Sequence, residues 1–391
     1  MLQNRLGKEK RLVVANVRKS FDVVIVGGGP AGIATGLTLG ARGISYCIVE
    51  ANLEPTRKLG EAIPPNARAL FKKLGIQHLM EAAEHTAYYG NKSCWGSSEL
   101  EQKEFIEGVY GHGYLLDRLQ FEKQLRVHIR NNDGAFMAGY KLRKVLRTEK
   151  GIEAHIQNEF ETQIISAKYI VDATGRKAAV CRQLGVQKQI VDNQFAIVCK
   201  AALFTSVAHQ IMVEATKNGW WYAAPQSATE LTLMFFTDLV LVPEKRKLAS
   251  FLQNELSKTL HLSKLIATAV LDFETIKVMP AGTSKLKKPY GVCWIAVGDA
   301  AYAFDPISSY GITSALASGF YAGHAMASAL ANEEDAMLAY SYVFENAFQA
   351  YMEKLAGQYA LEMRWEGSRY WKARHDTLIL DLIDKPDYQL S

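Results

Sequence analysis

The sequence is poor in several features that define whole classes of proteins. Its five cysteines lie far apart, without the paired spacing of a zinc site, an iron–sulfur cluster or a redox dithiol. The basic segment 1–20 has only a short apolar run, so it lacks the hydrophobic region of a signal peptide, and no later stretch is long enough to span a bilayer. We therefore expect a cytoplasmic protein without a metal site, in which residues 1–20 form a flexible basic leader.

An excess of charge of one sign is also missing. Lys and Arg number 45 and Asp and Glu number 40, which leaves a net charge of +5. This charge is too small and too dispersed to predict binding to nucleic acid or to an anionic membrane. The chain contains no internal repeat, low-complexity block or Pro/Gly-rich linker, which predicts interleaved domains rather than domains in series.

What is present is the pattern of an α/β protein with a large core. The chain has 391 residues, of which 49% are hydrophobic. Residues 21–26 and 46–49 are typical of buried strands, and residues 33–39 between them have helical spacing, which together predict one β-α-β unit. Two further buried strands are predicted at 169–172 and 292–297.

Two longer regions complete the expected architecture. From 195 to 237, apolar and polar residues alternate and aromatic residues are frequent, as in a sheet with one covered face. We expect this region to form a separate layer on the substrate side. Small and apolar residues recur at helical spacing over 312–330 and 333–362, so the chain should close in helices.

A glycine pattern occupies the turn after the first strand. Gly27, Gly29 and Gly32 form the spacing G-x-G-x-x-G between that strand and the following helix. In such a turn the first glycine makes a tight bend, the second lets the backbone approach a pyrophosphate, and the third permits close helix packing. Glu50, at the end of the second strand, is placed to accept hydrogen bonds from a ribose. The sequence therefore predicts a bound dinucleotide.

Two more segments, 172–176 and 298–301, resemble the remaining fingerprints of FAD-dependent aromatic hydroxylases and their relatives. The resemblance implies FAD as the resident cofactor, with Asp299 holding its ribityl chain. It also implies that the helix after Gly311 points its N-terminus at the flavin, where the helix dipole favours negative charge on the reduced ring. Because we find no separate nicotinamide fingerprint, NADH or NADPH should bind only transiently, or a partner reductase should supply electrons.

Segments 58–65, 117–125 and 305–312 extend this resemblance to flavin-dependent halogenases and geranylgeranyl-reductase-like proteins. The implied fold is α/β, with an FAD-binding Rossmann-like core of the aromatic-hydroxylase type, an interleaved β-sheet substrate domain and a helical C-terminus. The expected boundaries are 21–83, 107–188 and 280–345 for the FAD-binding domain, 84–106 and 189–279 for the substrate-binding sheet, and 346–391 for the C-terminal helical segment. The residues expected to bind FAD are Gly27, Gly29, Pro30, Ala31, Gly32, Glu50, Ala51, Gly60, Arg118, Val145, Asp172, Thr174, Gly175, Gly298, Asp299, Pro306, Gly311 and Ile312.

The sequence departs from the halogenases at two places. Their Trp-x-Trp-x-Ile-Pro signature is only partly present, at 220–225. The lysine that carries the activated halogen would fall near position 87, which is Ala87 here. Lys92 is the nearest lysine, but its spacing is wrong, and a single lysine is most often a solvated surface residue. Halogenation is therefore not the first hypothesis.

A more specific resemblance comes from segments 90–97, 219–225 and 364–371, together with Arg374. These segments are similar to the flavoproteins of tryptophylquinone cofactor biogenesis, the maturation partners of lysine and glycine oxidases. The resemblance implies an FAD-dependent monooxygenase that hydroxylates a tryptophan side chain in a precursor oxidase during cysteine tryptophylquinone biosynthesis. The chemistry would use molecular oxygen and a flavin C4a-hydroperoxide.

Three residues are candidates for catalysis. Glu61 lies beside the apolar turn 63–65 and could hold the proton that the reaction needs, although it could also only orient the flavin or its loop. Ser308 and Ser309 lie in the segment expected beside the flavin. The residues expected to build a wall for an indole, which core packing would explain equally well, are Trp95, Trp220, Trp221 and Tyr222.

The same sequence leaves other functions open. One is a flavin-dependent halogenase, which halide dependence would reveal. Another is a reductase or hydroxylase of a free small aromatic or isoprenoid, which would turn over a small molecule in solution. The third is a non-catalytic, flavin-stabilised chaperone of the precursor, which would still support maturation when it carries a redox-dead flavin analogue.

Overall fold

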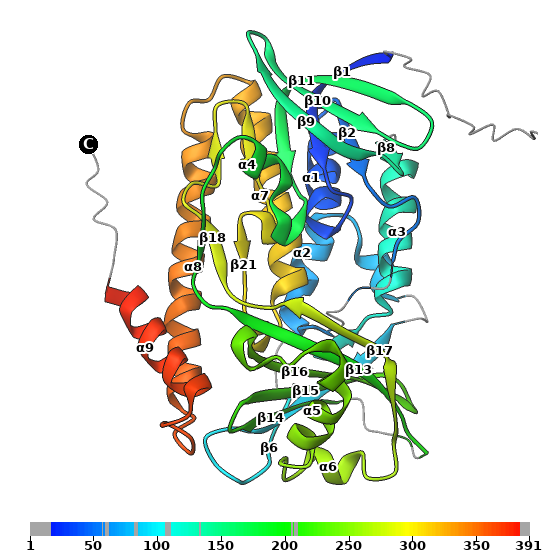
Figure 1. Ribbon diagram of the computed structural model, residues 1–391. Helices are drawn as coiled ribbons and strands as arrows, with labels where there is room; N and C mark the ends of the chain where they lie inside the picture. The colour runs from blue at the N-terminus through cyan, green and yellow to red at the C-terminus, as the bar shows by residue number, and fades with distance from the viewer. Residues whose placement is uncertain are drawn as a thin grey trace, which may run out of the picture.

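The computed structural model describes residues 17–56, 58, 62–81, 85–105, 111–132, 134–204, 206 and 210–383. Within this part of the chain a mainly parallel sheet lies at one end and a mainly antiparallel sheet at the other (Figure 1). Long helices run beside both sheets. The structure is therefore the α/β architecture that the sequence predicts, with strands from distant parts of the chain brought into each sheet.

The mainly parallel sheet is built around the first strand. It contains β1 (Val17–Val26), β2 (Tyr46–Glu50), β8 (Ala135–Ala138), β11 (Thr162–Asp172), β19 (Tyr290–Gly291) and β20 (Trp294–Ala296). Their order is β19-β20-β11-β1-β2-β8, and β1 pairs in parallel with both β2 and β11. Helix α1 (Pro30–Ala41) connects β1 to β2, so the predicted β-α-β unit is present.

The first strand is longer than predicted. It begins at Val17, which pairs with Gln163 of β11, so residues 17–20 of the expected leader belong to the sheet. Residues 1–16 lie outside the described part of the chain. Next to β11, two further strands extend the sheet in antiparallel order, namely β10 (Gly151–Gln157) and β9 (Lys141–Thr148).

The second sheet corresponds to the predicted alternating region. It contains β17 (Val270–Pro280), β13 (Gln194–Ala202), β16 (Glu230–Asp238), β15 (Gly219–Ser227), β14 (Gln210–Thr216), β5 (Gly90–Cys94) and β6 (Glu101–Glu104), in that order. One face packs against helices α5 (Leu248–Leu256) and α6 (Leu262–Leu265) through Leu252, Leu262 and Phe235. The other face joins the main core of the molecule.

Two small three-stranded sheets complete the strand structure. One contains β12 (Lys188–Ile190), β18 (Ser284–Leu286) and β21 (Tyr302–Ala303), and the other contains β3 (Ala62–Ile63), β7 (Gly113–Leu115) and β4 (Thr86–Tyr88). In Figure 1, β18 and β21 lie between the two large sheets. The chain segments that join the two halves of the molecule are therefore themselves held by hydrogen-bonded strands.

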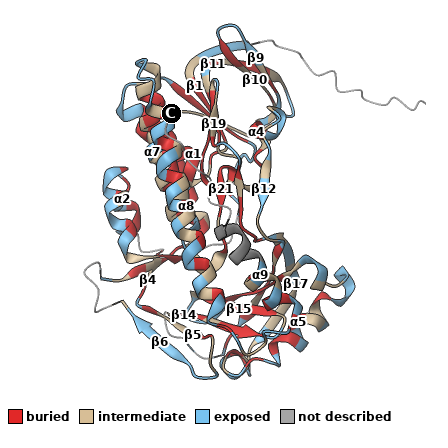
Figure 2. Ribbon diagram, turned by 90° about the vertical axis from the view of Figure 1, so that its left-hand side faces the viewer, coloured by how far each residue is buried: buried red, intermediate tan, exposed pale blue. Residues whose placement is uncertain are grey.

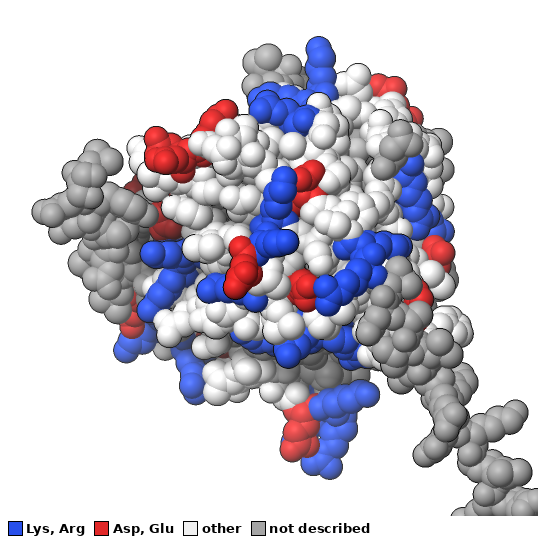
Figure 3. All heavy atoms as spheres, turned by 90° about the horizontal axis from the view of Figure 1, so that it is seen from above, with Lys and Arg blue, Asp and Glu red and all other residues white. Residues whose placement is uncertain are grey.

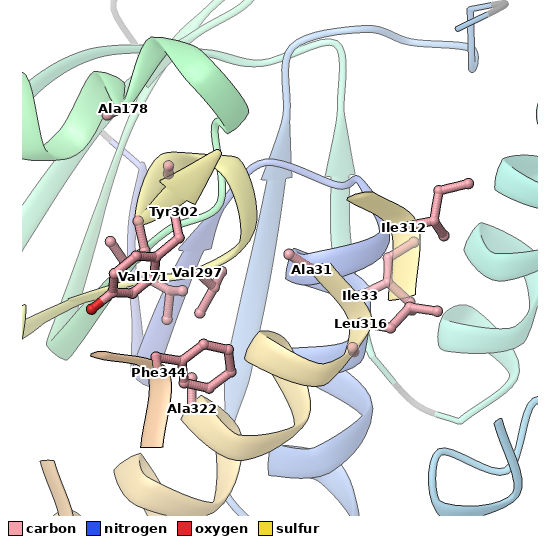
Figure 4. Packing of buried hydrophobic residues seen from close by; sticks show 14 of the residues in the cluster. Ala31, Ile33, Val171, Ala178, Val297, Tyr302, Ile312, Leu316, Ala322 and Phe344 are labelled. Atoms are coloured by element: carbon pink, nitrogen blue, oxygen red, sulfur yellow. The ribbon is translucent and has the colours of Figure 1, made fainter. Parts of the chain in front are cut away.

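Helix α7 (Gly311–Leu330) packs tightly against α1 in the main core. The approach is so close that a Cβ atom on Gly319 would lie 2.2 Å from the carbonyl oxygen of Ala31. Figure 4 shows Ala31 and Ile33 of α1 beside Leu316 of α7. This contact joins the start of α1 to the middle of α7. Because α7 is a continuous helix, the contact also holds the start of α7 in place relative to α1, and both starts belong to the expected FAD site.

Helix α8 (Ala336–Ala360) is continuous and runs from the parallel sheet to the second sheet (Figure 1). The predicted boundary between residues 345 and 346 therefore falls inside one helix. Along α8, buried positions alternate with exposed ones, as a helix lying on the surface of a core requires (Figure 2). Helix α9 (Arg369–Ile383) follows, and no helix in the described ranges has the length and apolarity to cross a membrane.

Charged side chains are mixed over the end of the molecule that carries β9 and β10. Figure 3, which looks down on this end, shows Lys and Arg interspersed with Asp and Glu and with uncharged residues. This face therefore does not present a continuous field of one sign, which matches the small net charge of +5.

Candidate FAD site

The turn between β1 and α1 leaves no room for side chains at two of its three motif glycines. Gly27 has a φ of +114°, and a Cβ atom on it would lie 2.1 Å from the carbonyl oxygen of Ala173. A Cβ atom on Gly32 would lie 1.9 Å from the carbonyl oxygen of Gly27. By contrast, a Cβ atom on Gly29 would meet no atom within 4 Å. The turn is packed behind Gly27 and Gly32 and open in front of Gly29.

The open side faces the N-terminus of α1. Gly29 is the N-cap residue and Pro30 occupies the first turn. Among the described residues, no side chain caps this terminus and its first turn carries no acidic residue. Free backbone N–H groups and the positive end of the helix dipole are therefore available to an anionic group. A pyrophosphate fits this position, where the glycine leaves space for it.

Glu50 ends β2 and fixes the second side of the turn. Its carboxylate accepts hydrogen bonds from the backbone N–H groups of Gly28, at 2.8 Å, and Asn52, at 2.9 Å. Arg126 of α3 (Arg118–Asn131) lies 3.8 Å from the same carboxylate and donates to the carbonyl oxygen of Leu53 at 3.0 Å. Glu50 is thus held next to the glycine turn. Ala51, which follows it, is exposed. The contact of Glu50 with a ribose stays a prediction.

The second fingerprint contains a carboxylate that shapes its own turn. Asp172 is fully buried and accepts hydrogen bonds from the backbone N–H of Thr174 at 3.0 Å, the Thr174 hydroxyl at 2.6 Å and the backbone N–H of Cys181 at 2.8 Å. Gly175 follows with a φ of +66°. The structure therefore places Asp172 and Thr174 in one capped turn at the end of β11.

The third fingerprint lies beside a group of cations. The Nε atom of Arg176 is 3.4 Å from a carboxylate oxygen of Asp299, and Lys188 donates to the backbone oxygen of Asp299 at 3.3 Å. The Asp299 side chain is one-third exposed. Desolvation raises the pKa of Asp299, while Arg176, Lys188 and Arg118 act to lower it. Lys188 is a neighbour that the sequence analysis missed, because no motif marks a lysine on a different strand.

Gly298, just before Asp299, is fixed by the helix contact. It has a φ of +56°, and a Cβ atom on it would lie 3.0 Å from the Cβ of Ala31. Its backbone N–H donates to the hydroxyl of Ser318 in α7 at 2.7 Å. The third fingerprint therefore touches both α1 and α7.

Arg118 is held at the start of α3 by a buried acid. Its guanidinium pairs with Glu122 at 2.6 Å, and Lys58 pairs with the other oxygen of Glu122 at 2.7 Å. Glu122 is buried, whereas Lys58 is partly exposed. The spacing of four residues between Arg118 and Glu122 is the signal that could have identified Glu122. Val145 lies farther out, on β9, where its backbone N–H donates to the side chain of Gln183.

The segment before α7 is called here the flavin-side loop, residues 305–312. Asp305 caps its short 3-10 turn by accepting from the backbone N–H of Ile307 at 2.9 Å. The Ser308 hydroxyl donates to the backbone oxygen of Asp305 at 2.8 Å, and Ser309 has a φ of +53°. Pro306 lies in this turn, and Gly311 and Ile312 begin α7. Both serines thus shape the loop, and their catalytic role stays a prediction, while Gly60 and Glu61 lie outside the described residues.

The predicted aromatic wall is divided between two faces of the second sheet. Trp220 and Tyr222 of β15 belong to the main core, as does Trp95. Trp221 points to the opposite face, with Phe235 and the α5 and α6 leucines. Neighbouring residues of a strand necessarily point in opposite directions. The structure therefore brings three of the four side chains to one side and leaves Trp221 on the other.

The three segments that carry the more specific resemblance meet in one cluster. The ring of Trp95 lies 5.2 Å from that of Trp371 and 6.1 Å from that of Trp220. The backbone N–H of Gly96 donates to the buried carboxylate of Glu362 at 2.8 Å. Tyr359 of α8 joins the cluster, since its hydroxyl accepts from the indole N–H of Trp220 at 3.1 Å. Residues far apart in the sequence thus form a single aromatic contact between the second sheet and the C-terminal helices.

The two positions compared with the halogenase lysine lie on different strands. Ala87 is in β4 and pairs with Tyr114, whereas Lys92 is in β5 and pairs with Met212. The strands belong to separate sheets. Sliding one strand along its neighbour therefore could not bring Lys92 to the place that Ala87 occupies.

Comparisons with known proteins agree with this geometry. A family model described as FAD binding domain matches residues 20–351. The putative FAD-dependent oxidoreductase LodB of Marinomonas mediterranea is 28% identical over 367 residues, which cover 91% of this chain and 97% of LodB.

Two solved structures show the fold. The myxobacterial chondrochloren halogenase CndH has a TM-score of 0.83 at 19% identity, over 95% of this chain and 92% of CndH. The peptidyl tryptophan dihydroxylase QhpG, described as essential for tryptophylquinone cofactor biogenesis, has a TM-score of 0.74 at 20% identity, over 91% of this chain and 79% of QhpG. At these identities the likeness concerns the fold alone.

Proposed function

Because this chain belongs to the FAD binding domain family and is an FAD-dependent oxidoreductase of the monooxygenase type, we propose that it hydroxylates a tryptophan side chain of a precursor oxidase protein. The modification would be a step in the biosynthesis of a cysteine tryptophylquinone cofactor. The substrate is then a protein side chain and not a free metabolite. Molecular oxygen is the second substrate, and NADH or NADPH supplies electrons transiently.

The observation that carries this proposal is the extent of the similarity to LodB. It covers 91% of this chain and 97% of that protein, so it includes both sheets and reaches beyond the nucleotide-binding turns that all such flavoproteins need. The cluster of Trp95, Trp220 and Trp371 supports it, because this cluster is formed by the segments that resemble the tryptophylquinone flavoproteins. QhpG, which has the same fold, is itself described as a peptidyl tryptophan dihydroxylase.

The residues of this chain divide into those that would bind FAD and those that would shape its surroundings. The α1 terminus would bind the pyrophosphate, Glu50 the ribose, and Asp299 with Arg118 the ribityl side. The flavin-side loop would lie against the ring. Bound FAD supplies the activation of oxygen, and the protein must exclude water and manage one proton.

The test combines the purified protein, NADH, oxygen and the precursor oxidase. We expect mass spectrometry of the digested precursor to find oxygen added to one tryptophan-containing peptide. A precursor in which that tryptophan is replaced by phenylalanine serves as the matched control and should gain no oxygen. Turnover of a free aromatic without any mass gain on the precursor would disprove the proposal.

Halogenation is the second candidate, because the fold matches CndH with a TM-score of 0.83. Against it, Ala87 occupies the position compared with the halogenase lysine. A halogenase would consume NADH and oxygen at a rate that depends on chloride or bromide and would yield a halogenated product. A reductase or hydroxylase of a free isoprenoid or aromatic would form its product in the absence of halide. A non-catalytic chaperone would still support maturation of the precursor when it carries a redox-dead flavin analogue.

A further inference from the structure

A cavity of about 640 Å³ lies between the C-terminal helices and the flavin-side loop. Its lining includes Asp192, Asp238, Asp305, Tyr359, Arg369 and Arg374. The cavity therefore reaches from exposed Arg369 to the first residue of the flavin-side loop. Its volume is far greater than a single water molecule requires, and its many polar groups suit ordered water.

Asp305 is the buried end of this cavity. Asp305 is only 2% exposed, and its Oδ2 atom accepts hydrogen bonds from the Tyr359 hydroxyl at 2.8 Å and the Gln194 amide at 3.0 Å. Its Oδ1 atom accepts from the backbone N–H of Ile307. All three donors are neutral groups.

Neutral donors also hold the buried carboxylate of Asp172, but Asp305 differs from Asp172 because it lines the cavity. Buried acids are as a rule paired with a cation. The nearby Arg374 instead donates to Asp238 at 2.7 Å and to Gln194 at 3.2 Å, and within the described part of the chain Asp305 forms no ion pair. A site with neutral donors on both oxygens can accommodate the ionised carboxylate and, after rotation of the Tyr359 hydroxyl, the protonated acid.

Tyr359 connects the cavity with this acid. It lines the cavity and donates to Asp305, and its oxygen accepts from the Trp220 indole and lies 3.5 Å from the Tyr370 hydroxyl. Tyr370 in turn donates to the Gln194 oxygen at 2.6 Å. The hydroxyl of Tyr359 therefore has both a donor side and an acceptor side, which passing on a proton requires.

We propose that Asp305 stores the proton used beside the flavin-side loop, and that Tyr359 transfers it there from water in the cavity. In each transfer the O–H bond of Tyr359 breaks as a new O–H bond forms on Oδ2 of Asp305. A hydronium ion in the cavity, which exchanges with solvent, then gives its proton to the phenolate oxygen and becomes water. One proton thus moves from solvent to Asp305, and no electrons are exchanged. The use of this proton in hydroxylation rests on the proposed function, whereas the loading of Asp305 does not.

The charges around Asp305 support the same assignment. Burial, with a smaller effect of the Asp192 carboxylate, raises the pKa of Asp305 to about 6, although the Ile307 N–H, Tyr359 and Arg374 act to lower it. The other titratable groups that face the cluster or the cavity are Tyr351 of α8, Tyr370 and Arg369 of α9, and Asp238 at the end of β16. A pKa of about 6 would let Asp305 change its protonation state close to neutral pH, as a proton donor at the site must.

The first experiment uses the full-length, FAD-loaded protein without substrate. As the pH is raised, infrared difference spectra should show that the carbonyl stretch of a protonated carboxyl group disappears, with a midpoint near pH 6. We expect this band to be absent in Asp305→Asn, which keeps an acceptor for the Ile307 N–H but cannot carry the proton. After a rapid pH jump, the band should form about tenfold more slowly in Tyr359→Phe.

Tyr351→Phe is the matched control. This variant also removes a buried phenol that contacts Asp305. The Tyr351 oxygen, however, accepts a hydrogen bond from the backbone N–H of Asp305 at 2.7 Å and does not contact the carboxyl group through a hydrogen bond. The protonation rate of Asp305 in this variant should equal that of the unmodified protein. If Tyr359→Phe fails to fold, Ala373→Phe offers a second variant. Its larger side chain would occupy part of the cavity that Ala373 lines, and should slow the protonation of Asp305.

The pH profile of oxygen-dependent NADH consumption by the FAD-loaded protein provides a second readout. We expect its inflection near pH 6 to be lost in Asp305→Asn and to stay in Tyr351→Phe. Equal protonation rates in both tyrosine variants, or an unchanged carbonyl band in Asp305→Asn, would overturn the proposal. Loading of Asp305 without tryptophan oxidation would contradict only the proposed function.

Discussion

The glycine turn after β1 and the flavin-side loop before α7 both belong to the candidate FAD site, but they are built from different parts of the chain. In the glycine turn, backbone packs directly against backbone, because a Cβ atom on Gly32 would lie only 1.9 Å from the carbonyl oxygen of Gly27. The flavin-side loop is held by side chains from α8 and from β13, through Tyr359 and Gln194. One region depends on the absence of side chains, and the other depends on their presence.

This difference has physical consequences for how each region responds to change. A packed backbone cannot give way, so any added atom must displace a strand or a helix. A loop held by hydrogen bonds to titratable groups can change its energy with pH and with conservative substitutions while keeping its shape. We therefore expect a substitution that adds atoms at the packed glycines to abolish the glycine turn. Substitutions and pH changes at the flavin-side loop should instead change stability and FAD properties in smaller steps.

The largest effect should come from Gly32→Ala. Its Cβ atom would lie 1.9 Å from the carbonyl oxygen of Gly27, so β1 and α1 would have to separate. We expect a loss of more than about 4 kcal/mol in the free energy of unfolding, with no measurable FAD binding. Urea unfolding of the FAD-free protein and titration with FAD measure the two quantities.

Gly29→Ala is the matched control for that variant. Its Cβ atom would meet no protein atom within 4 Å, so the stability of the FAD-free protein should change by less than about 0.5 kcal/mol. FAD affinity should nevertheless fall, because the methyl group enters the space predicted for the pyrophosphate. Unchanged FAD affinity in Gly29→Ala would contradict the assignment of this space.

The next effect compares two adjacent residues of β15. Trp220→Ala and Trp221→Ala each remove a fully buried indole, and each should lower the free energy of unfolding by about 3 kcal/mol. Only Trp220 donates to Tyr359, so only Trp220→Ala should alter the absorption spectrum of bound FAD. Equal spectral changes in both variants would show that the flavin-side loop responds to general loosening and not to its own side-chain supports.

A smaller effect follows from the pKa of Asp305. Because its pKa rises from 3.8 to about 6 on folding, its contribution to stability is complete below about pH 4 and is lost as the pH rises through 6. Asp305→Asn cannot titrate, so its stability relative to the unmodified protein should increase between about pH 4 and about pH 7, by at most roughly 3 kcal/mol. Urea midpoints measured across this range test the sign, and parallel profiles would refute it.

The smallest effect is expected for Glu50→Gln. The amide keeps one acceptor for the backbone N–H groups but places its NH₂ group against the other, and Arg126 loses its charged partner. We expect FAD to bind about tenfold more weakly, equivalent to about 1.4 kcal/mol. Asp22→Asn is the control, since Asp22 pairs with Lys168 and Ser45 at the other end of the β1–β2 pair and should leave FAD affinity unchanged.

The sequence predicted backbone-built features better than side-chain-built ones. The glycine spacing, together with the apolar runs before and after it, predicted a strand, a tight turn and a helix, and the structure has them at β1 and α1. Strand alternation also predicted the second sheet but not which of Trp220 and Trp221 faces the main core, because that depends on the registration of β15 in the sheet. The cavity and the Asp305 cluster could not be predicted, since Gln194, Asp305 and Tyr359 are distant in the sequence and no short motif joins them.

Helix α8 sets a length that the chain cannot easily change. Tyr340, near its start, donates to the backbone oxygen of Ala296 in the parallel sheet, and Tyr359, near its end, donates to Asp305. The two tyrosines are separated by about 28 Å of continuous helix, at about 1.5 Å per residue. Deleting a single residue between them would rotate Tyr359 by about 100° about the helix axis, away from the flavin-side loop. Insertions or deletions should therefore be excluded from the stretch of helix between Tyr340 and Tyr359.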